Sequence, residues 1–188
     1  MFINPDSFSD GQIGSKLWLC EELENLGWSS HITHIYAGWY ALTAFLLLNR
    51  KKFQVNYIRS FDIDPECQIV ADIINSNWIC QDWKFKAYTH DCNMILKNIM
   101  TPDTGKCDLI INTSTEHFKS MDWFHNIPAG TRVILQGNNM LHDDHYVYSE
   151  TLNDFIKTYP LAEINYTGQK EFKYSNWGFT RYMIVGIK

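Results

Sequence analysis

The sequence has no excess of basic residues. Its 188 residues include 16 Lys and Arg against 21 Asp and Glu, which gives a formal net charge of −5. Nucleic acids are bound largely through cationic side chains, so this charge disfavours a nucleic-acid partner. The densest basic segment, "NRKK" at 49–52, is interpreted as a solvated helix end, where the helix dipole stabilises cations.

Long hydrophobic runs and paired cysteines are also missing. No segment approaches the roughly 20 apolar residues that span a bilayer, and the start, "MFINPDSFSDGQ", lacks the pattern of a secretory signal. Five cysteines stand at 20, 67, 80, 92 and 107, without a C-x-x-C pair. An odd number of scattered cysteines is typical of small buried side chains in a reducing compartment. We therefore expect a cytoplasmic protein with no membrane partner and no disulfides.

Linkers, repeats and low-complexity tracts are absent as well, which predicts one domain over 1–188. Its N-terminal segment, 1–30, carries apolar residues at helical spacing and is followed past the helix end by Gly27. We expect this helix to pack on the rest of the fold or to lie over a ligand.

Strand-like and helix-like segments alternate along the chain. Strands are predicted at 31–37, 54–63, 83–91, 107–114 and 132–139, with helices at 42–52, 65–77 and 92–100, a turn at 101–106 and a helix ended by Pro160. Two further strand-like runs, 162–167 and 181–188, close the chain without a helix between them. Alternation predicts a three-layer α/β fold with a mostly parallel sheet, and the final pair predicts an antiparallel edge.

Polar residues and a glycine follow the first three predicted strands. Gly38 comes after the first strand, where it allows either a close approach of a ligand or a tight turn. Asp62 ends the second strand, 24 residues later, at a position suited to accept hydrogen bonds from a ribose diol. Asp64 is better placed to cap the helix that begins at Pro65. Asp91 follows the third strand and either binds an exocyclic amine or caps the next helix.

Five motifs together resemble the class I S-adenosylmethionine-dependent methyltransferases: the glycine turn, "DIDP", "HDC", "DLIINTS" and "PAG", in an order that runs from about His31 to the C-terminus. The resemblance implies a Rossmann-like sheet of seven strands, with the last one antiparallel and beside the fifth. It implies S-adenosylmethionine as the cofactor. It also implies the following cofactor-binding residues: Ala37, Gly38, Trp39 and Tyr40 near the methionine moiety, Asp62 and Ile63 at the ribose, Asp91 and Cys92 at the adenine, and Asn112 where donor and acceptor meet.

The sequence departs from that family in two places. The glycine-rich turn of the family carries two or three glycines, whereas Trp39 and Tyr40 stand here, with rings that either pack on the cofactor or block it. The loop after the fourth strand reads "NTSTEH" rather than the "NPPY" type of enzymes that methylate exocyclic amines in nucleic acids. That difference favours a small-molecule methyl acceptor.

Candidate catalytic residues follow the fourth strand. Asn112, Glu116 and His117 lie on the expected ligand side, and either of the last two could act as a general base. Alternatively, "STEH" opens a helix with Ser114 as its N-cap and both side chains exposed. The candidate substrate-binding residues are Asn138, Asn139, Tyr174, Trp177 and Arg181, although Trp177 could equally cover the sheet edge. Lys16, in the N-terminal segment, could reach the cofactor carboxylate.

The loop at 142–145, "HDDH", offers metal-ligand atoms. Because the fourth strand ends in Asn112 rather than in an acid, we interpret this loop as polar surface and expect no metal. The favoured function is in-line methyl transfer to a small molecule. Two alternatives stay open: an NAD-dependent oxidoreductase, which lacks its G-x-G-x-x-G motif here, and a noncatalytic module that binds S-adenosylmethionine or another nucleoside.

Overall fold

A seven-stranded sheet forms the centre of the computed structural model, which describes residues 3–50, 52–98 and 106–188. Its order is β3-β2-β1-β4-β5-β7-β6. The parallel strands are β1 (Ser29–Tyr36), β2 (Gln54–Asp62), β3 (Phe85–Thr89), β4 (Leu109–Asn112) and β5 (Arg132–Asn138). The strand β7 (Gly178–Ile187) is antiparallel to β5 and to β6 (Glu163–Lys173) and lies between them. The predicted sheet is therefore confirmed.

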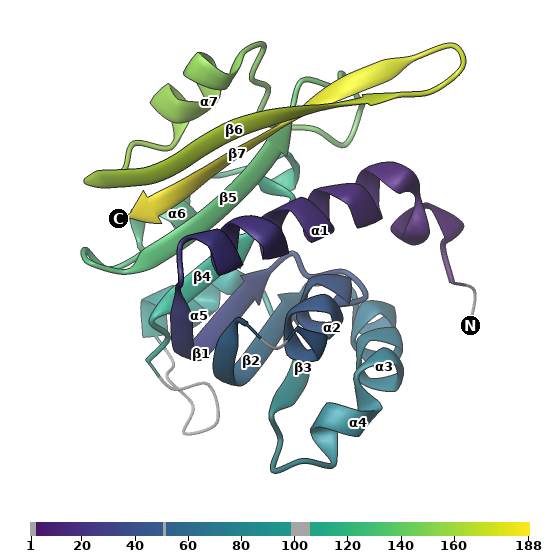
Figure 1. Ribbon diagram of the computed structural model, residues 1–188, viewed down its shortest axis with the longest axis vertical. Coiled ribbons are helices and arrows are strands. Elements are labelled where there is room, and N and C mark those ends of the chain that lie inside the picture. Colours follow the sequence, from purple (N-terminus) through teal and green to yellow (C-terminus); the bar gives the residue numbers. More distant parts are fainter. Residues whose placement is uncertain (1–2, 51, 99–105) are drawn as a thin grey trace.

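Helices cover both faces of this sheet (Figure 1). On one face lie α1 (Asp10–Asn25), α2 (Leu42–Asn49) and α3 (Pro65–Ile74), and α3 is followed by the short α4 (Ser76–Ile79). The other face carries α5 (Cys92–Asn98), α6 (Asp122–His125) and α7 (Leu152–Thr158). Successive strand residues point to opposite faces. Accordingly, Ile35 belongs to the core under α1 and α2, while Tyr36 belongs to the core with Trp123.

Local signals account for several of the helix boundaries. The Ser9 side chain accepts a hydrogen bond from the Gln12 N–H and caps α1, and Gly27, at φ 64°, follows its end in the left-handed conformation. Pro65 opens α3, and Asp64 Oδ1 accepts from the Glu66 N–H at 2.9 Å, as predicted. The predicted turn at 101–106 lies outside the described residues except for Lys106.

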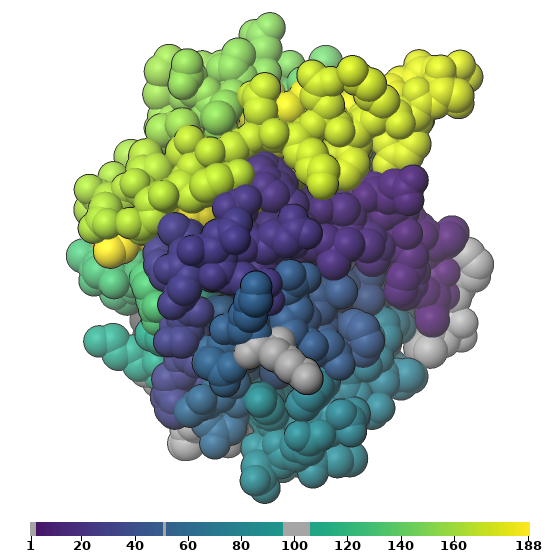
Figure 2. Space-filling model, viewed as in Figure 1, coloured from purple at the N-terminus to yellow at the C-terminus, as the bar shows by residue number. Residues whose placement is uncertain are grey.

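The N-terminal segment packs across the sheet. Figure 2 shows α1, in purple, crossing the molecule between the β6–β7 hairpin and α2. Its Leu19 and Leu23 are buried in the core, and Trp18 Nε1 donates to Tyr166 Oη at 3.1 Å on β6. A 3-10 helix, η1 (Pro5–Phe8), precedes α1. The N-terminal end of this segment lies beside the carboxyl ends of the parallel strands, where the Asn4 N–H donates to Tyr40 Oη at 3.2 Å.

The last two strands are longer than predicted. They extend to Lys173 and from Gly178, because the rings of Phe172 and Phe179 stack across the pair at 5.3 Å.

All five cysteines are free, as predicted, and Cys20, Cys67 and Cys92 are buried. Among the described residues, no helix is long and apolar enough to cross a membrane.

Candidate active site

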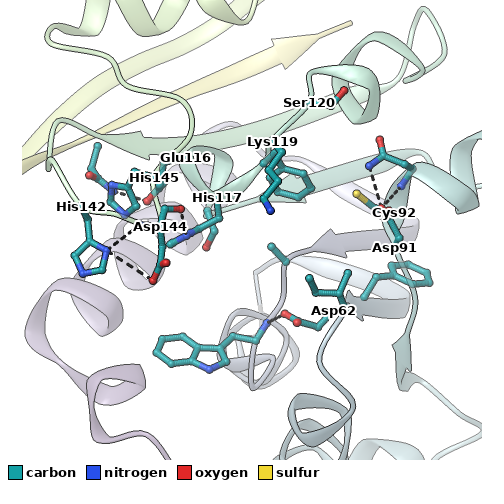
Figure 3. Close-up of a pocket in the computed structure, with 18 of the residues that line it drawn as sticks. Asp62, Asp91, Cys92, Glu116, His117, Lys119, Ser120, His142, Asp144 and His145 are labelled. Carbon is teal, nitrogen blue, oxygen red and sulfur yellow. Dashed lines mark hydrogen bonds and ion pairs between the residues drawn. The ribbon is translucent and has the colours of Figure 1, made fainter.

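A cavity of about 670 Å³ opens at the carboxyl ends of the parallel strands. It spans the point between β1 and β4 where the strand order reverses, the usual ligand site of open α/β sheets. Its wall is built from the N-terminal segment, the turn after β1, the ends of β2, β3 and β5, the η2 helix (Thr115–His117), the β5–α7 loop and β7. Figure 3 shows Asp62, Asp91 and Cys92 on one side of it and Glu116, His117 and His145 on the other.

Asp62 is held at the end of β2 by backbone donors. Its Oδ2 accepts from the Trp39 N–H at 2.8 Å, and its Oδ1 accepts from the Asp64 N–H at 3.1 Å. Burial raises the pKa of Asp62, and these hydrogen bonds oppose the rise. The carboxyl group lines the cavity. Asp64, on the same loop, lies outside the wall.

Asp91 and Cys92 line the cavity at the start of α5. Asp91 Oδ1 accepts from the Asn93 N–H at 2.8 Å, so this residue caps the helix as well as facing the cavity. Burial raises the pKa of the Cys92 thiol to about 12, which keeps it protonated. Ile63, although it is 76% exposed, also belongs to the wall and offers an apolar surface beside Asp62.

The turn after β1 is left-handed at three positions, none of which is glycine. Ala37, Trp39 and Ala41 have φ values of 47°, 48° and 53°. Gly38 lies between them, outside the wall, and a Cβ there would come within 2.0 Å of Ser60 Oγ on β2. Its missing side chain therefore allows close packing of the turn on the sheet, while Ala37 and Trp39 form the wall.

Tyr40 points away from the cavity. Its ring packs with Cys67 and Val70, and its hydroxyl accepts from the Asn4 N–H at 3.2 Å. Only Trp39 of the two aromatic residues in the turn lines the cavity, and a volume of about 670 Å³ is present beside it. Pockets for small ligands commonly have about 300–1,000 Å³.

Glu116 is an ion-paired carboxylate on the opposite wall. It is 3% exposed, and its Oε1 lies 3.1 Å from Arg181 Nη1 and accepts from Asn138 Nδ2. Asn138 and Arg181, both predicted near the acceptor, line the cavity with it. The alternative interpretation, in which the side chain of Glu116 is exposed at a helix start, is wrong, because Arg181 and Asn138 hold it inside.

His117 and His145 lie side by side on this wall. Their ring centroids are 4.8 Å apart at an interplanar angle of 87°. His117 is exposed, but Ser114 makes no capping hydrogen bond. From the loop interpreted as polar surface, His142 and Asp144 line the cavity with His145, and Asp143 does not.

Four other predicted site residues lie outside the wall. Asn112 is buried, and its Oδ1 accepts from the Ser114 N–H at 3.0 Å, which shapes the turn before η2. The Thr180 N–H donates to Asn139 Oδ1 at 2.8 Å, so that side chain is used beside β7. Tyr174 and Trp177 stack at 4.3 Å, and the Gly11 N–H donates to Tyr174 Oη. They hold the start of α1 instead of facing the cavity.

Sequence reasoning missed wall residues of the N-terminal segment, Asp6 and Gln12. The segment was predicted to pack on the rest of the fold or to lie over the ligand, with Lys16 as its ligand-binding residue. Lys16 itself lies outside the wall. Lys16 is buried, and its Nζ donates to Gln12 Oε1 at 2.5 Å. Burial, followed by the charge of Arg181, lowers the pKa of Lys16 to about 7.

No family model matches the sequence, and no curated protein matches it significantly. Solved structures do match. The N-methyltransferase NodS from Bradyrhizobium japonicum WM9 has a TM-score of 0.65 at 11% identity, over 94% of this chain and 97% of that chain. Magnesium protoporphyrin IX methyltransferase (ChlM) from Synechocystis PCC 6803 has a TM-score of 0.62 at 13% identity, over 94% and 82%.

A putative RNA methyltransferase from Pyrococcus horikoshii has a TM-score of 0.60 at 10% identity, over 96% of this chain and 86% of that chain. NodS has also been solved with S-adenosyl-L-homocysteine, and the ChlM structure holds S-adenosylmethionine. At these identities the likeness establishes the fold, which is the Rossmann-like fold of the class I methyltransferases.

Proposed function

We propose that this protein is an S-adenosylmethionine-dependent methyltransferase. The observation that carries the proposal is the placement of Asp62, Asp91 and Cys92 at the ends of adjacent strands, on one side of an open cavity, in a methyltransferase fold. The S-adenosyl-L-homocysteine bound to NodS and the S-adenosylmethionine bound to ChlM support the same assignment.

The residues present fit this cofactor. The Asp62 carboxylate accepts hydrogen bonds from the ribose hydroxyls, and hydrogen bonds to a charged acceptor are stronger than those to a neutral one. Asp91 accepts from the adenine amine, and the exposed Ile63 packs on the flat base, which gives its apolar side chain a partner. Ala37 and Trp39 line the methionine end. The bound cofactor supplies an activated methyl group on a sulfonium, and the protein's main task is to hold an acceptor in line with it.

The acceptor half of the cavity is the side with Glu116, His117 and His145. A molecule placed there lies beside imidazole nitrogens, which can take a proton or hold a cation. Asn138 and Arg181 position Glu116, and Asn112 positions the turn that carries it.

We further propose that the acceptor is a small molecule. The wall carries the carboxyl groups of Asp6, Asp62, Asp91 and Asp144, and the net charge is −5. With Glu116, these acidic side chains outnumber the lysine and arginine side chains of the wall, Lys119 and Arg181, and a net negative charge repels the phosphates of a nucleic acid. The structural neighbours include enzymes of both kinds, so this proposal rests on charge.

The test is calorimetric titration of the purified protein, in buffer with EDTA, with S-adenosylmethionine, S-adenosylhomocysteine and NAD. We expect micromolar binding of the first two and none of NAD. Asp62→Ala should weaken binding by about tenfold or more, the effect of 1.4 kcal/mol. The matched control is Asp64→Ala, on the same loop but outside the wall, which should bind normally. Absence of binding by the wild type, or an equal loss in both variants, would overturn the proposal.

A further inference from the structure

Three potential metal ligands meet on the acceptor side of the cavity. One ligand-type atom from each of Glu116, His117 and His145 lies within 4.8 Å of the others. Two segments are involved, η2 and the β5–α7 loop. The Tyr146 and Val147 N–H groups join them by donating to the Glu116 carbonyl oxygen at 2.7 and 3.2 Å. The backbone therefore holds His145 against Glu116.

Both imidazoles are oriented by carbonyl oxygens. His117 Nδ1 lies 3.1 Å from the Asp144 carbonyl oxygen, and His145 Nδ1 lies 2.8 Å from the Met140 carbonyl oxygen. A carbonyl oxygen can only accept, so each Nδ1 carries a hydrogen, and in the neutral ring each Nε2 then keeps its lone pair. Histidine ligands of metals are held in this way, with the distal nitrogen hydrogen-bonded to a backbone carbonyl or a carboxylate.

The Glu116 carboxylate is used on one side only. Its Oε1 is bound by Arg181 and Asn138, whereas its Oε2 is buried without a hydrogen-bond partner among the described residues. A buried oxygen without a hydrogen-bond donor destabilises the fold, and more so when it is charged. This observation is independent of the histidines, and a cation at the cluster would give the oxygen a partner.

We propose that Glu116, His117 and His145 bind a divalent ion of borderline softness, such as Zn²⁺. Two imidazole nitrogens and one carboxylate form a donor set that such ions favour, and three protein ligands leave a coordination position open. Zinc lies about 2.0–2.2 Å from nitrogen and oxygen ligands, so in tetrahedral geometry two of its ligands are about 3.3–3.6 Å apart. The three side chains therefore have to approach one another by up to about 1.5 Å on binding, a movement that the exposed His117 permits.

The open position faces the cavity, because all three side chains line it. The role of the ion rests on the proposed methyltransferase function: the ion binds a hydroxyl group of the methyl acceptor. A metal lowers the pKa of a bound oxygen, so the hydroxyl releases its proton to solvent more readily. The oxygen then attacks the methyl carbon, and a C–O bond forms as the C–S bond breaks to leave a neutral thioether. The acceptor class that this site fits is a small molecule with a hydroxyl group.

The test is titration of untagged, EDTA-stripped protein with Zn²⁺ by calorimetry and with Co²⁺ by visible absorption. We expect one ion per chain. His117→Ala and His145→Ala should each weaken binding by about tenfold or more, since even changes to residues that only support metal ligands cost 10–100-fold. The matched control is His125→Ala, an exposed histidine on α6 outside the cavity wall.

Stoichiometric binding that is lost in both cluster variants and kept in His125→Ala would support the site. No Zn²⁺ binding by the wild type, or an equal loss in His125→Ala, would overturn it. Glu116→Gln also tests the carboxylate, but it disturbs the buried pair with Arg181, so the two histidine variants decide. S-adenosylhomocysteine is titrated into the metal-free protein, so that failure of the cofactor proposal and failure of the metal site give different results.

Discussion

Arg181 Nη1 lies 3.1 Å from Glu116 Oε1, and the two side chains are only 5% and 4% exposed. Arg181 belongs to β7, the strand inserted between β5 and β6, whereas Glu116 follows β4. The same guanidinium also donates to the Thr113 carbonyl oxygen at 3.4 Å. The antiparallel part of the sheet thus orients a carboxylate at the end of the parallel part, and Glu116 Oε2 stays without a hydrogen-bond partner among the described residues.

Removing Arg181 should be costly. We expect Arg181→Met to lower the free energy of unfolding by about 3–5 kcal/mol, because it leaves the Glu116 carboxylate buried and unpaired. The measurement is urea unfolding in metal-free buffer. Arg50→Met, which removes a more exposed arginine from its pair with Glu24, should cost about 0–1 kcal/mol. An equal cost for the two variants would contradict the prediction. So would a double variant, Arg181→Met with Glu116→Gln, whose free energy of unfolding is no higher than that of Arg181→Met alone.

Lys16 should make stability depend on pH. Its pKa is about 7 in the folded chain, mainly because of burial and then the charge of Arg181, against 10.5 as the ordinary value. Between these values the unfolded chain binds more protons, so the free energy of unfolding rises with pH, by at most about 1.4 kcal/mol per unit. The gain is complete above pH 10.5 and absent below pH 7.

The measurement compares urea unfolding at pH 7.0 and 8.5 for the wild type and Lys16→Met. We expect the rise in the wild type and a flatter profile in Lys16→Met. The exposed Lys170→Met variant controls for loss of a surface charge and should keep the wild-type profile. The assignment fails if Lys16→Met shows the same rise as the wild type.

The sheet was predictable because strand–helix alternation and a closing strand pair constrain topology strongly. The positions of Asp62, Ile63, Asp91 and Cys92 beside the cavity were predictable for the same reason, since each lies at or just after the end of a parallel strand. Side-chain contacts between distant parts of the chain could not be predicted from the sequence. Glu116 finds Arg181 65 residues away, and nothing local distinguishes an ion-paired glutamate from an exposed one.

Asp108 was missed in the same way. It stands at the opposite end of β4 from the cavity and accepts from Ser30 Oγ at 2.8 Å and from the Ile32 N–H at 2.9 Å. Burial opposes its ionisation, but these hydrogen bonds and Arg132 outweigh it and lower the pKa of Asp108. Tyr174 and Trp177 were predicted near the acceptor, with covering of the sheet edge as the alternative for Trp177. In the structure they pack on each other, and Tyr174 Oη accepts from the Gly11 N–H at the start of α1.

The turn after β1 should contain removable strain. Ala37 has φ 47°, a conformation that costs roughly 1–2 kcal/mol for a residue with a Cβ. Glycine relieves this strain, but its greater conformational freedom in the unfolded chain cancels part of the gain. We therefore expect Ala37→Gly to raise the free energy of unfolding by about 0.5–1 kcal/mol. Thermal and urea unfolding measure the change. Ala162→Gly, at a position without positive φ, should be neutral or destabilising, and a similar gain there would contradict the explanation.

Gly38 presents a different case, because the constraint is a contact and not a dihedral angle. Its φ is not in the left-handed region, but a Cβ would lie 2.0 Å from Ser60 Oγ and 3.4 Å from Ser60 Cβ. Gly38→Ala should therefore cost about 1–3 kcal/mol through overpacking. Removing only the hydroxyl with Ser60→Ala leaves an ordinary contact, so the double variant should recover most of that loss.

A double-mutant cycle by urea unfolding measures this coupling. The matched control is Gly27→Ala, where φ is 64° and no atom lies within 4 Å of the added Cβ. It should be destabilised by backbone strain alone, and Ser60→Ala should not rescue it. If Ser60→Ala rescues neither variant, Gly38 is required for another reason, such as approach of a ligand to the backbone. Rescue of Gly38→Ala alone would show that the glycine after β1 serves the packing of this turn on β2.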